Sequence, residues 1–294
     1  MELIGRSPMS VMNIRQIEIP IGLESPVKLL HVSDTHLSFA DRRDNSRKRA
    51  LAKRRRVTFG DGDDRCRRFL REAVEYAGEN GALLVHTGDL IDFVSYQNLD
   101  IAKELLGPSD YFFVPGNHEF SKYVGEAEET EAYKMDSLPL VQSYFRDDLR
   151  FCSRVVGGVN LVGVDNVYYH MSADQFARLK AEVAKGLPIV LCMHTPLYTP
   201  DLFHEMMDAR GEACAYLMGC PEALMRDYPP KRYTQQAATP LDFEIIEYIE
   251  AQPLIKAVLA GHLHFFHQSE LPGGVTQYVA GGGYKGEAIE YTLR

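Results

Sequence analysis

Five short polar motifs in this chain carry side chains that can bind metal ions. Each one directly follows an apolar run: Asp34-Thr35-His36, Gly88-Asp89-Leu90-Ile91-Asp92, Gly116-Asn117-His118-Glu119, His194-Thr195-Pro196 and Gly261-His262-Leu263-His264. Their donor groups are carboxylates, one amide and several imidazoles, with no thiolate among them. Such a donor set suits borderline divalent metals such as Mn, Fe or Zn.

Two of the motifs place their donors two residues apart, in the pairs Asp34/His36 and His262/His264. In an extended chain, this spacing turns both side chains toward the same face. Each pair is therefore expected to approach one metal ion or two adjacent ions. Three motifs also contain a glycine directly before a donor residue, and glycine permits sharp turns and a close approach of the backbone.

The elements that must position these motifs are short buried strands. Apolar runs at residues 27–33, 82–88, 111–116, 188–194 and 255–261 lead into the five motifs, and runs of this length predict strands. In α/β sheets, binding groups gather beyond the carboxyl ends of the strands. We therefore expect the motifs to meet at a common point.

The rest of the chain predicts an α/β protein with an α+β character toward its end. Further strands are predicted at 14–21, 151–158, 160–166, 276–281 and 288–293, and helices at 65–80, 99–106, 173–185 and 240–251. The capping residues Ser172 and Thr239 mark two of the helix starts. No linker long enough to separate domains is present. One domain over 1–294 is therefore expected, with insertions near 40–64 and 197–240, the second of them a candidate cap.

Composition excludes several classes of protein. The chain has 294 residues, of which 45% are hydrophobic, and it lacks both an apolar run of about 18 residues and the apolar stretch of a secretory signal. We therefore expect a cytoplasmic protein that makes no use of a membrane. The five cysteines are scattered and contain no C-x-x-C, which favours reduced structural thiols over disulfides or a zinc knuckle.

Charge is distributed unevenly along the chain. The net charge of −9 argues against a general nucleic-acid binder. The run at 42–56 nevertheless holds nine basic residues and one acidic residue. It is interpreted as a solvated helix or a mobile loop. Because it follows the first motif, the alternative is that it steers an anionic substrate or a nucleic acid toward the site.

The order D-x-H, G-D-x-x-D, G-N-H-E, H, G-H-x-H resembles the calcineurin-like metallophosphoesterase superfamily, and the motifs span residues 34 to 264. The resemblance implies a four-layer α/β/β/α sandwich with a two-metal centre at its rim. It implies that one ion is bound by Asp34, His36 and His264. It implies that the second ion is bound by Asn117, His194 and His262, and that the Asp89 carboxylate bridges the two ions. Two cations about 3.5–4 Å apart generate a bridging hydroxide that attacks phosphorus in a phosphomonoester or phosphodiester.

The resemblance also implies that His118 is the general acid for the leaving alkoxide and that Asp92 accepts its other N–H. The alternative makes Asp92 a helix N-cap and His118 a turn residue. Phe93 and Val94 replace the Arg-Gly that protein Ser/Thr phosphatases of the superfamily carry at these positions, which disfavours a protein phosphatase. Purple acid phosphatases need a tyrosine where Asp92 stands, and superfamily nucleases commonly have a histidine there.

A small phosphorylated substrate is therefore expected, and nucleic acid is not favoured. His204, in the 197–240 insertion, is a candidate substrate-binding residue, and the aromatic residues of this insertion are interpreted as a small local core. Two alternatives stay open. One is a metal-dependent nuclease that uses the basic run 42–56. The other is a catalytically silent scaffold or binding protein on the same fold, although no ligand position is missing here.

Overall fold

The computed structural model describes residues 12–60, 62–126 and 128–294. Its strands are β1 (Asn13–Ile19), β2 (Val27–Val32), β3 (Leu83–His86), β4 (Tyr111–Phe113), β5 (Phe151–Val156), β6 (Val159–Val164), β7 (Ile189–Cys192), β8 (Ile255–Ala260), β9 (His267–Glu270), β10 (Thr276–Val279) and β11 (Glu287–Leu293). Its helices are α1 (Ser46–Gly60), α2 (Arg65–Glu79), α3 (Tyr96–Leu106), α4 (Glu131–Gln142), α5 (Ala173–Val183), α6 (Pro200–His204), α7 (Pro230–Gln236) and α8 (Pro240–Ala251). The predicted domain begins at residue 1, and its first eleven residues lie outside the described residues.

Two sheets face each other, with the strand orders β1-β11-β2-β3-β4 and β5-β6-β7-β8-β10-β9. The strands that lead into the motifs are β2, β3 and β4 in the first sheet and β7 and β8 in the second. Within each sheet these strands run parallel to one another. Their carboxyl ends therefore lie at one edge of each sheet, as the motif positions predict.

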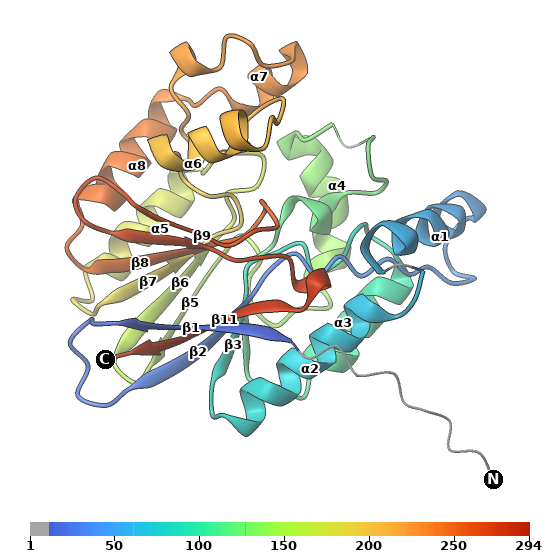
Figure 1. Cartoon of the computed structure of the whole chain (residues 1–294), viewed down its shortest axis with the longest axis horizontal. Helices are drawn as coiled ribbons and strands as arrows, with labels where there is room; N and C mark the ends of the chain where they lie inside the picture. Colours follow the sequence, from blue (N-terminus) through green and yellow to red (C-terminus); the bar gives the residue numbers. More distant parts are fainter. Residues whose placement is uncertain (1–11, 61, 127) are drawn as a thin grey trace.

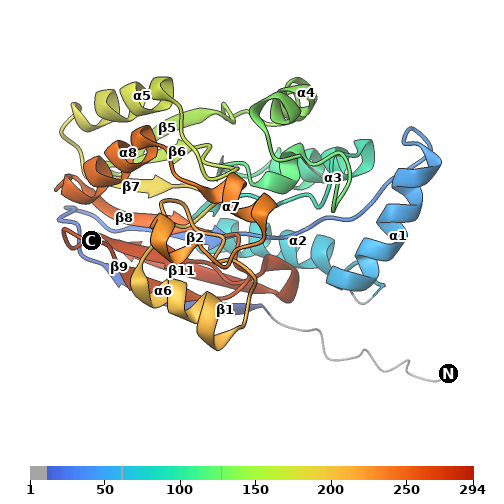
Figure 2. The ribbon, with the colours of Figure 1, turned by 90° about the horizontal axis from the view of Figure 1, so that it is seen from above.

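Three apolar clusters separate four layers of structure. Helices α2 and α3 cover the outer face of the first sheet, α5 and α8 cover the outer face of the second, and a third cluster lies between the sheets (Figures 1 and 2). Neighbouring residues of one strand enter different clusters: Leu29 lies in the inter-sheet cluster and Leu30 in the outer one. Because side chains alternate along a strand, a strand covered on both faces is apolar throughout. The predicted α/β/β/α sandwich is confirmed.

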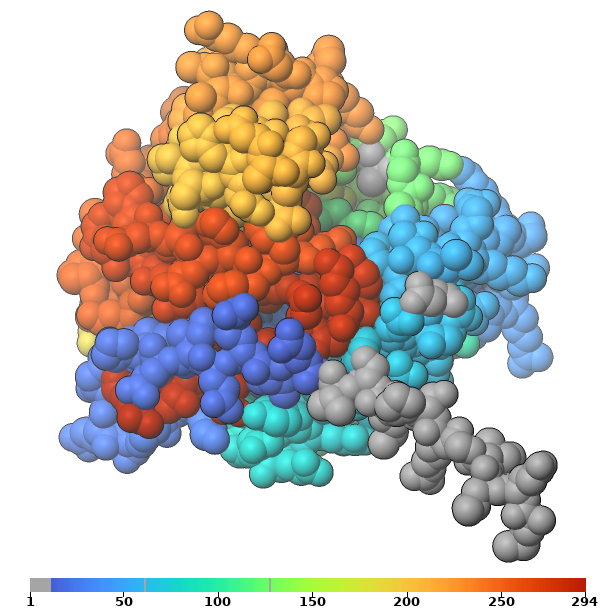
Figure 3. Space-filling view, viewed as in Figure 1, coloured from blue at the N-terminus to red at the C-terminus, as the bar shows by residue number. Residues whose placement is uncertain are grey.

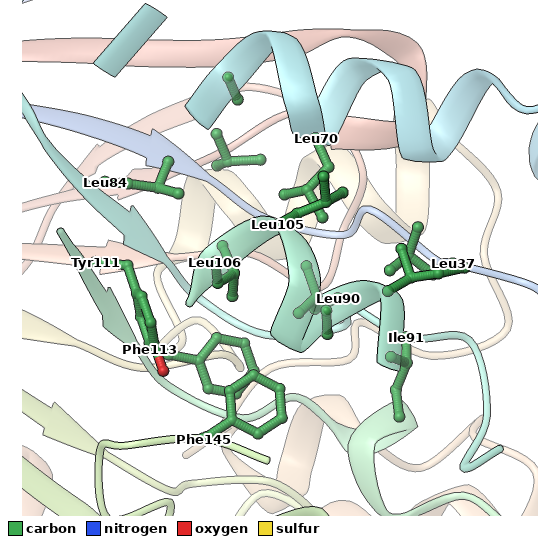
Figure 4. Packing of buried hydrophobic residues seen from close by; sticks show 14 of the residues in the cluster. Leu37, Leu70, Leu84, Leu90, Ile91, Leu105, Leu106, Tyr111, Phe113 and Phe145 are labelled. Atoms are coloured by element: carbon green, nitrogen blue, oxygen red, sulfur yellow. The ribbon is translucent and has the colours of Figure 1, made fainter. Parts of the chain in front are cut away.

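The outer cluster of the first sheet also holds the motif loops in place. Figure 4 shows Leu84 of β3 together with Leu70 of α2 and Leu105 of α3. Leu37 and Leu90 belong to the same cluster, and both are fully buried. These two residues sit beside polar motif residues in the chain, so burying them fixes the loops that carry the candidate ligands.

The structure adds elements that the apolar pattern does not predict. The basic run 42–56 folds mostly as α1, which agrees with a solvated helix and not with a mobile loop. Helix α4 contains Pro139 and has little amphipathic character, so its pattern does not indicate a helix. Strand β9 is polar, with exposed or half-buried residues at three of its four positions. Among the described residues, no helix is both long and apolar enough to cross a bilayer.

The 197–240 insertion forms a small unit of its own, called the cap here. It contains α6 and α7, and its buried residues, among them Phe203, Cys214 and Tyr228, make a separate apolar cluster. Figure 3 shows the atoms of the cap gathered at one end of the molecule, above the C-terminal strands. The expected local core is therefore present, with Tyr216 packed against its side.

Candidate metal centre

The first group of candidate ligands lies where β2, β3 and β8 end. Asp34, His36, Asp89 and His264 each offer one ligand atom, and these atoms all lie within 4.8 Å of one another. The Nε2 atoms of His36 and His264 are 3.0 Å apart, and Nε2 of His264 is 3.2 Å from Oδ1 of Asp34. Two ring nitrogens that face each other beside a carboxylate make a suitable cation site.

A second group lies beside the first and shares one carboxylate with it. Oδ2 of Asp89 is 3.3 Å from Nε2 of His194, which is 3.1 Å from Nδ1 of His262. The same Asp89 oxygen is 3.8 Å from Nε2 of His36 in the first group. One carboxylate oxygen therefore stands between the two groups, in the position of a bridge.

Asn117 adds an amide to the second group. It lines the same pocket as Asp89 and His262, and its Oδ1 atom is buried without a hydrogen-bond partner among the described residues. Oδ1 of Asp34 is likewise buried and has no hydrogen-bond partner there. Leaving buried polar atoms unpaired costs free energy, so these two oxygens fit the role of metal ligands.

The protonation states of the site reflect burial and the nearby carboxylates. Burial lowers the pKa of His36 to about 4 and that of His262 to about 3, so both imidazoles are neutral, as ligands must be. Burial also acts to lower the pKa of His194, but the Asp89 carboxylate outweighs it and raises that pKa to about 9.

The backbone conformation at the ligands differs from the expected one. Asp34 and His36 have φ values of 56° and 53°, and His262 and His264 have values of 72° and 60°. The explanation of the two-residue spacing by an extended chain is therefore wrong. Left-handed residues turn the chain sharply, at a cost of roughly 1–2 kcal/mol each for residues other than glycine. The paired side chains converge because the loop curls around the site.

Backbone hydrogen bonds hold these curled loops against one another. The N–H of Asp34 donates to the carbonyl of Gly88 and that of His36 to the carbonyl of Asp89, both at 2.9 Å. The N–H of His262 donates to Oδ2 of Asp34, also at 2.9 Å. The loops of the two sheets are thus connected directly at the candidate ligands.

The buried carboxylate of Glu119 links two of the motifs by hydrogen bonds. Its carboxylate accepts hydrogen bonds from the N–H groups of Asp89 (2.8 Å), Ile91 (3.1 Å) and Gly116 (2.6 Å). Burial and the Asp89 charge raise the pKa of Glu119 to about 7, against the effect of these donors. A Cβ at Gly116 would lie 2.2 Å from Oδ1 of Asp89, so glycine is needed for close approach. The sequence does not show that Glu119 links these motifs.

Asp92 orients His118 through its backbone carbonyl and not through its carboxylate. Nδ1 of His118 donates to the backbone carbonyl of Asp92 at 2.6 Å, whereas Oδ1 of the carboxylate is 3.4 Å away. Nε2 of His118 is left on the side of Asp89, 3.9 Å from Oδ2. The alternative that Asp92 is a helix N-cap is wrong, because Ser95 caps α3.

The carboxylate of Asp92 is instead paired with a residue of the basic helix. Arg55 donates to it twice, from Nε at 2.6 Å and from Nη2 at 2.8 Å. On the same helix, the ring of Phe59 stacks on the His36 imidazole with centroids 4.1 Å apart. Leu51, Arg55 and Phe59 are spaced i, i+4, which places them on one helix face. This spacing was the signal that could have assigned α1 to the site.

A pocket of about 260 Å³ opens beside the two groups, lined by candidate ligands and by cap residues such as Met206, Tyr216 and Arg232. His204 does not line this pocket. Its side chain is 68% exposed and pairs with Asp208 at 2.7 Å. The structure therefore brings together all the predicted ligands, with His118 and Asp92, but leaves His204 on the outer surface of the cap.

The sandwich and its two carboxylate–imidazole groups define a metallophosphoesterase. The family model for calcineurin-like phosphoesterases matches residues 27–266, and the chain belongs to this family. A dimetal phosphatase from Danio rerio has a similar fold, with a TM-score of 0.51 at 12% identity over 88% of each chain. A 5'-nucleotidase from Candida albicans SC5314 matches with a TM-score of 0.42 at 13% identity, over 88% of this chain and 46% of that one. Comparison with curated protein sequences gives no match.

Proposed function

We propose that this protein uses two divalent metal ions to hydrolyse a small phosphoester. The family and the metal-binding groups support metal-dependent phosphoester hydrolysis in general. The observation that carries the two-ion proposal is the position of Asp89, whose Oδ2 atom lies within 3.8 Å of His36 Nε2 and within 3.3 Å of His194 Nε2. Asp34, His36 and His264 would hold one ion, and Asn117, His194 and His262 the other. The donor types favour Mn, Fe or Zn.

Residues beside the ions would donate a proton to the leaving group and orient the proton donor. Bound divalent ions supply an activated water and stabilise negative charge on the phosphoryl oxygens. As water adds to phosphorus and the bond to the leaving oxygen breaks, His118 donates a proton from Nε2 to that oxygen. The carbonyl of Asp92 holds the proton on Nδ1 of His118, which keeps the ring oriented. The carboxylates of Asp89 and Asp92 raise the pKa of His118, although burial opposes them, and this favours the acid form.

The first experiment tests the metal site by Asp89→Asn, with Asp208→Asn as the control. Asp208 is an exposed aspartate on the cap. After purification with Mn²⁺, the wild type and D208N are expected to hold about two ions per chain by elemental analysis and to hydrolyse p-nitrophenyl phosphate or its diester. D89N should lose metal and turnover together. Full turnover in D89N would contradict the proposal, and a metal-free, inactive wild type would favour the scaffold alternative.

The second experiment tests the general acid by His118→Asn, with His204→Asn as the control. Removal of a general acid costs about 10²–10⁴-fold when the leaving group is a poor one. H118N should therefore lose far more activity toward an alkyl phosphate than toward p-nitrophenyl phosphate, whose leaving group needs no proton. It should also keep its metal content. An equal loss on both esters would contradict the proposed role.

A further inference from the structure

The pocket between the cap and the candidate metal centre carries unusual backbone conformations. Nine described residues other than glycine have positive φ, and seven of them line this pocket. Three are candidate ligands; the other four are Glu129, Tyr168, Tyr169 and Tyr216, with φ between 51° and 70°. Such strain persists only where the surroundings impose it, and it gathers at functional sites. The part of the pocket lining formed by Glu129, Tyr168, Tyr169, Tyr216 and Arg232 is called the pocket wall here.

Polar groups on that wall include donors and acceptors with spare capacity. The hydroxyl of Tyr168 is buried and makes no hydrogen bond among the described residues. Arg232 of α7 donates from Nη1 to both carboxylate oxygens of Glu129, at 3.1 and 3.2 Å, which joins the cap to the loop before α4. All hydrogen bonds of Arg232 to described residues use Nη1. A guanidinium offers five N–H donors, so most of its capacity remains for a ligand.

An aromatic side chain connects this polar wall to the candidate ligands. The guanidinium of Arg232 lies over the ring of Tyr216 at 5.3 Å, and that ring lies 5.9 Å from the ring of His262. Tyr216 therefore contacts both Arg232 and a candidate ligand. Because Tyr168 lines the same pocket, we expect the leaving group of a phosphoester bound at the metal ions to meet these three side chains.

The charges on the wall decide what kind of leaving group fits. Glu129 already neutralises Arg232, and Glu212 adds a further carboxylate to the lining. A second anionic group on the substrate would meet net negative charge, and a purely apolar one would leave these polar groups unpaired. Hydroxyl groups suit the wall, because each can donate to a carboxylate and accept from Arg232 or Tyr168. A volume of about 260 Å³ accommodates a single ring.

We propose that this pocket binds a neutral, polyhydroxylated leaving group, so that the substrate is a sugar-like phosphomonoester recognised by Arg232, Glu129 and Tyr168. The proposal rests on the proposed hydrolase function. Hydrolysis would release the free polyol and inorganic phosphate, with water as the co-reactant. Arg232 would act as a specificity residue and Tyr216 as the surface against which the ring lies.

The test compares three phosphomonoesters in the Mn²⁺-loaded protein. Glucose 6-phosphate has the proposed hydroxyls, cyclohexylmethyl phosphate has a similar ring without them, and p-nitrophenyl phosphate reports the metal chemistry alone. The wild type is expected to prefer glucose 6-phosphate over cyclohexylmethyl phosphate in kcat/KM by about 10-fold or more, since each hydrogen bond to a charged group contributes about 1.5–3 kcal/mol.

The variants are Arg232→Gln and Tyr168→Phe, with Arg226→Gln, an exposed cap residue, as the control. R232Q should lower kcat/KM for glucose 6-phosphate about 10- to 100-fold and lower that for p-nitrophenyl phosphate by a much smaller factor. Y168F removes only a hydroxyl, so it tests the same wall if R232Q is unstable. An equal loss on both esters, or a wild-type preference for the cyclohexyl ester, would overturn the inference. No turnover of p-nitrophenyl phosphate by the wild type would instead refute the hydrolase function itself.

Discussion

Replacing Arg55 by alanine would leave the carboxylate of Asp92 buried without its guanidinium partner. The Asp92 side chain is 0% exposed and that of Arg55 is 20% exposed, and two short hydrogen bonds join them. Removing one partner of a buried ion pair costs roughly 3–5 kcal/mol. Because Arg55 is partly exposed, water can reach the space it leaves. We therefore expect a loss near the lower limit, about 3 kcal/mol of unfolding free energy.

The matched control is Arg54→Ala, one position earlier in α1, where the side chain is exposed. Urea unfolding of both variants after EDTA treatment would measure the difference without a contribution from bound metal. R54A is expected to change the unfolding free energy by less than about 0.5 kcal/mol. At each urea concentration, the folded fraction of metal-free R55A should be lower than that of the wild type.

The pH dependence of this effect has a definite sign. Burial alone would raise the pKa of Asp92, but Arg55 and His36 hold it below its usual range. The folded state therefore keeps Asp92 ionised where the unfolded chain would protonate it, so the stabilisation is complete above about pH 4 and fades as the pH falls. The difference between R55A and wild type should shrink below about pH 4. Equal stability of R55A and R54A at pH 7 would refute the reasoning.

Three further perturbations test other parts of the structure. Gly261→Ala would place a Cβ 1.8 Å from Oγ of Ser33 and 2.7 Å from Oδ2 of Asp34; it should reduce bound metal by elemental analysis, whereas Gly78→Ala, with open space around its Cβ, should not. Burial lowers the pKa of His31 and of His86 to about 3. Below about pH 6.5 these two histidines are therefore protonated in the unfolded chain but not in the folded state. Urea titrations of EDTA-treated protein should show the unfolding free energy falling by up to about 1.4 kcal/mol per histidine per pH unit. An unfolding free energy that does not change from pH 7 to 5 would contradict this. EDTA should lower the Tm of the native protein, and excess Mn²⁺ should restore it. At a free Mn²⁺ concentration of 100 times the Kd, the bound metal stabilises the folded state by about 2.7 kcal/mol. An unchanged Tm would argue against a tight metal site.

The strands and the candidate ligands could be predicted because their signals are local. An apolar run followed by a polar residue marks both a buried strand and its end, and parallel strands bring such ends to one edge. The positions of Asp34, His194 and His262 follow from this pattern. The left-handed conformations of Asp34 and His262 do not, because nothing in the residue types Asp and His requires positive φ. The tertiary hydrogen bonds between the loops impose it.

The residues that surround the ligands could not be predicted because their partners are distant in the chain. Arg55 meets a carboxylate 37 positions away, and Arg232 meets one 103 positions away. In the basic run, Arg55 has the same residue type as the arginines that stay exposed to solvent, so its type alone does not show that it pairs with a buried carboxylate. Only the i, i+4 spacing from Leu51 through Arg55 to Phe59 distinguishes the inward face of α1.

The distribution of backbone strain shows how the site is kept ready for a metal ion. Five candidate ligands have positive φ, at a cost of roughly 1–2 kcal/mol each. The contacts that balance this cost come from the protein: the buried Leu37 and Leu90, the three bonds to Glu119, and the backbone bonds between loops. The ligand geometry is therefore supported by packing and hydrogen bonds within the protein. A metal ion that binds only the folded chain would add its binding free energy to the stability of that state.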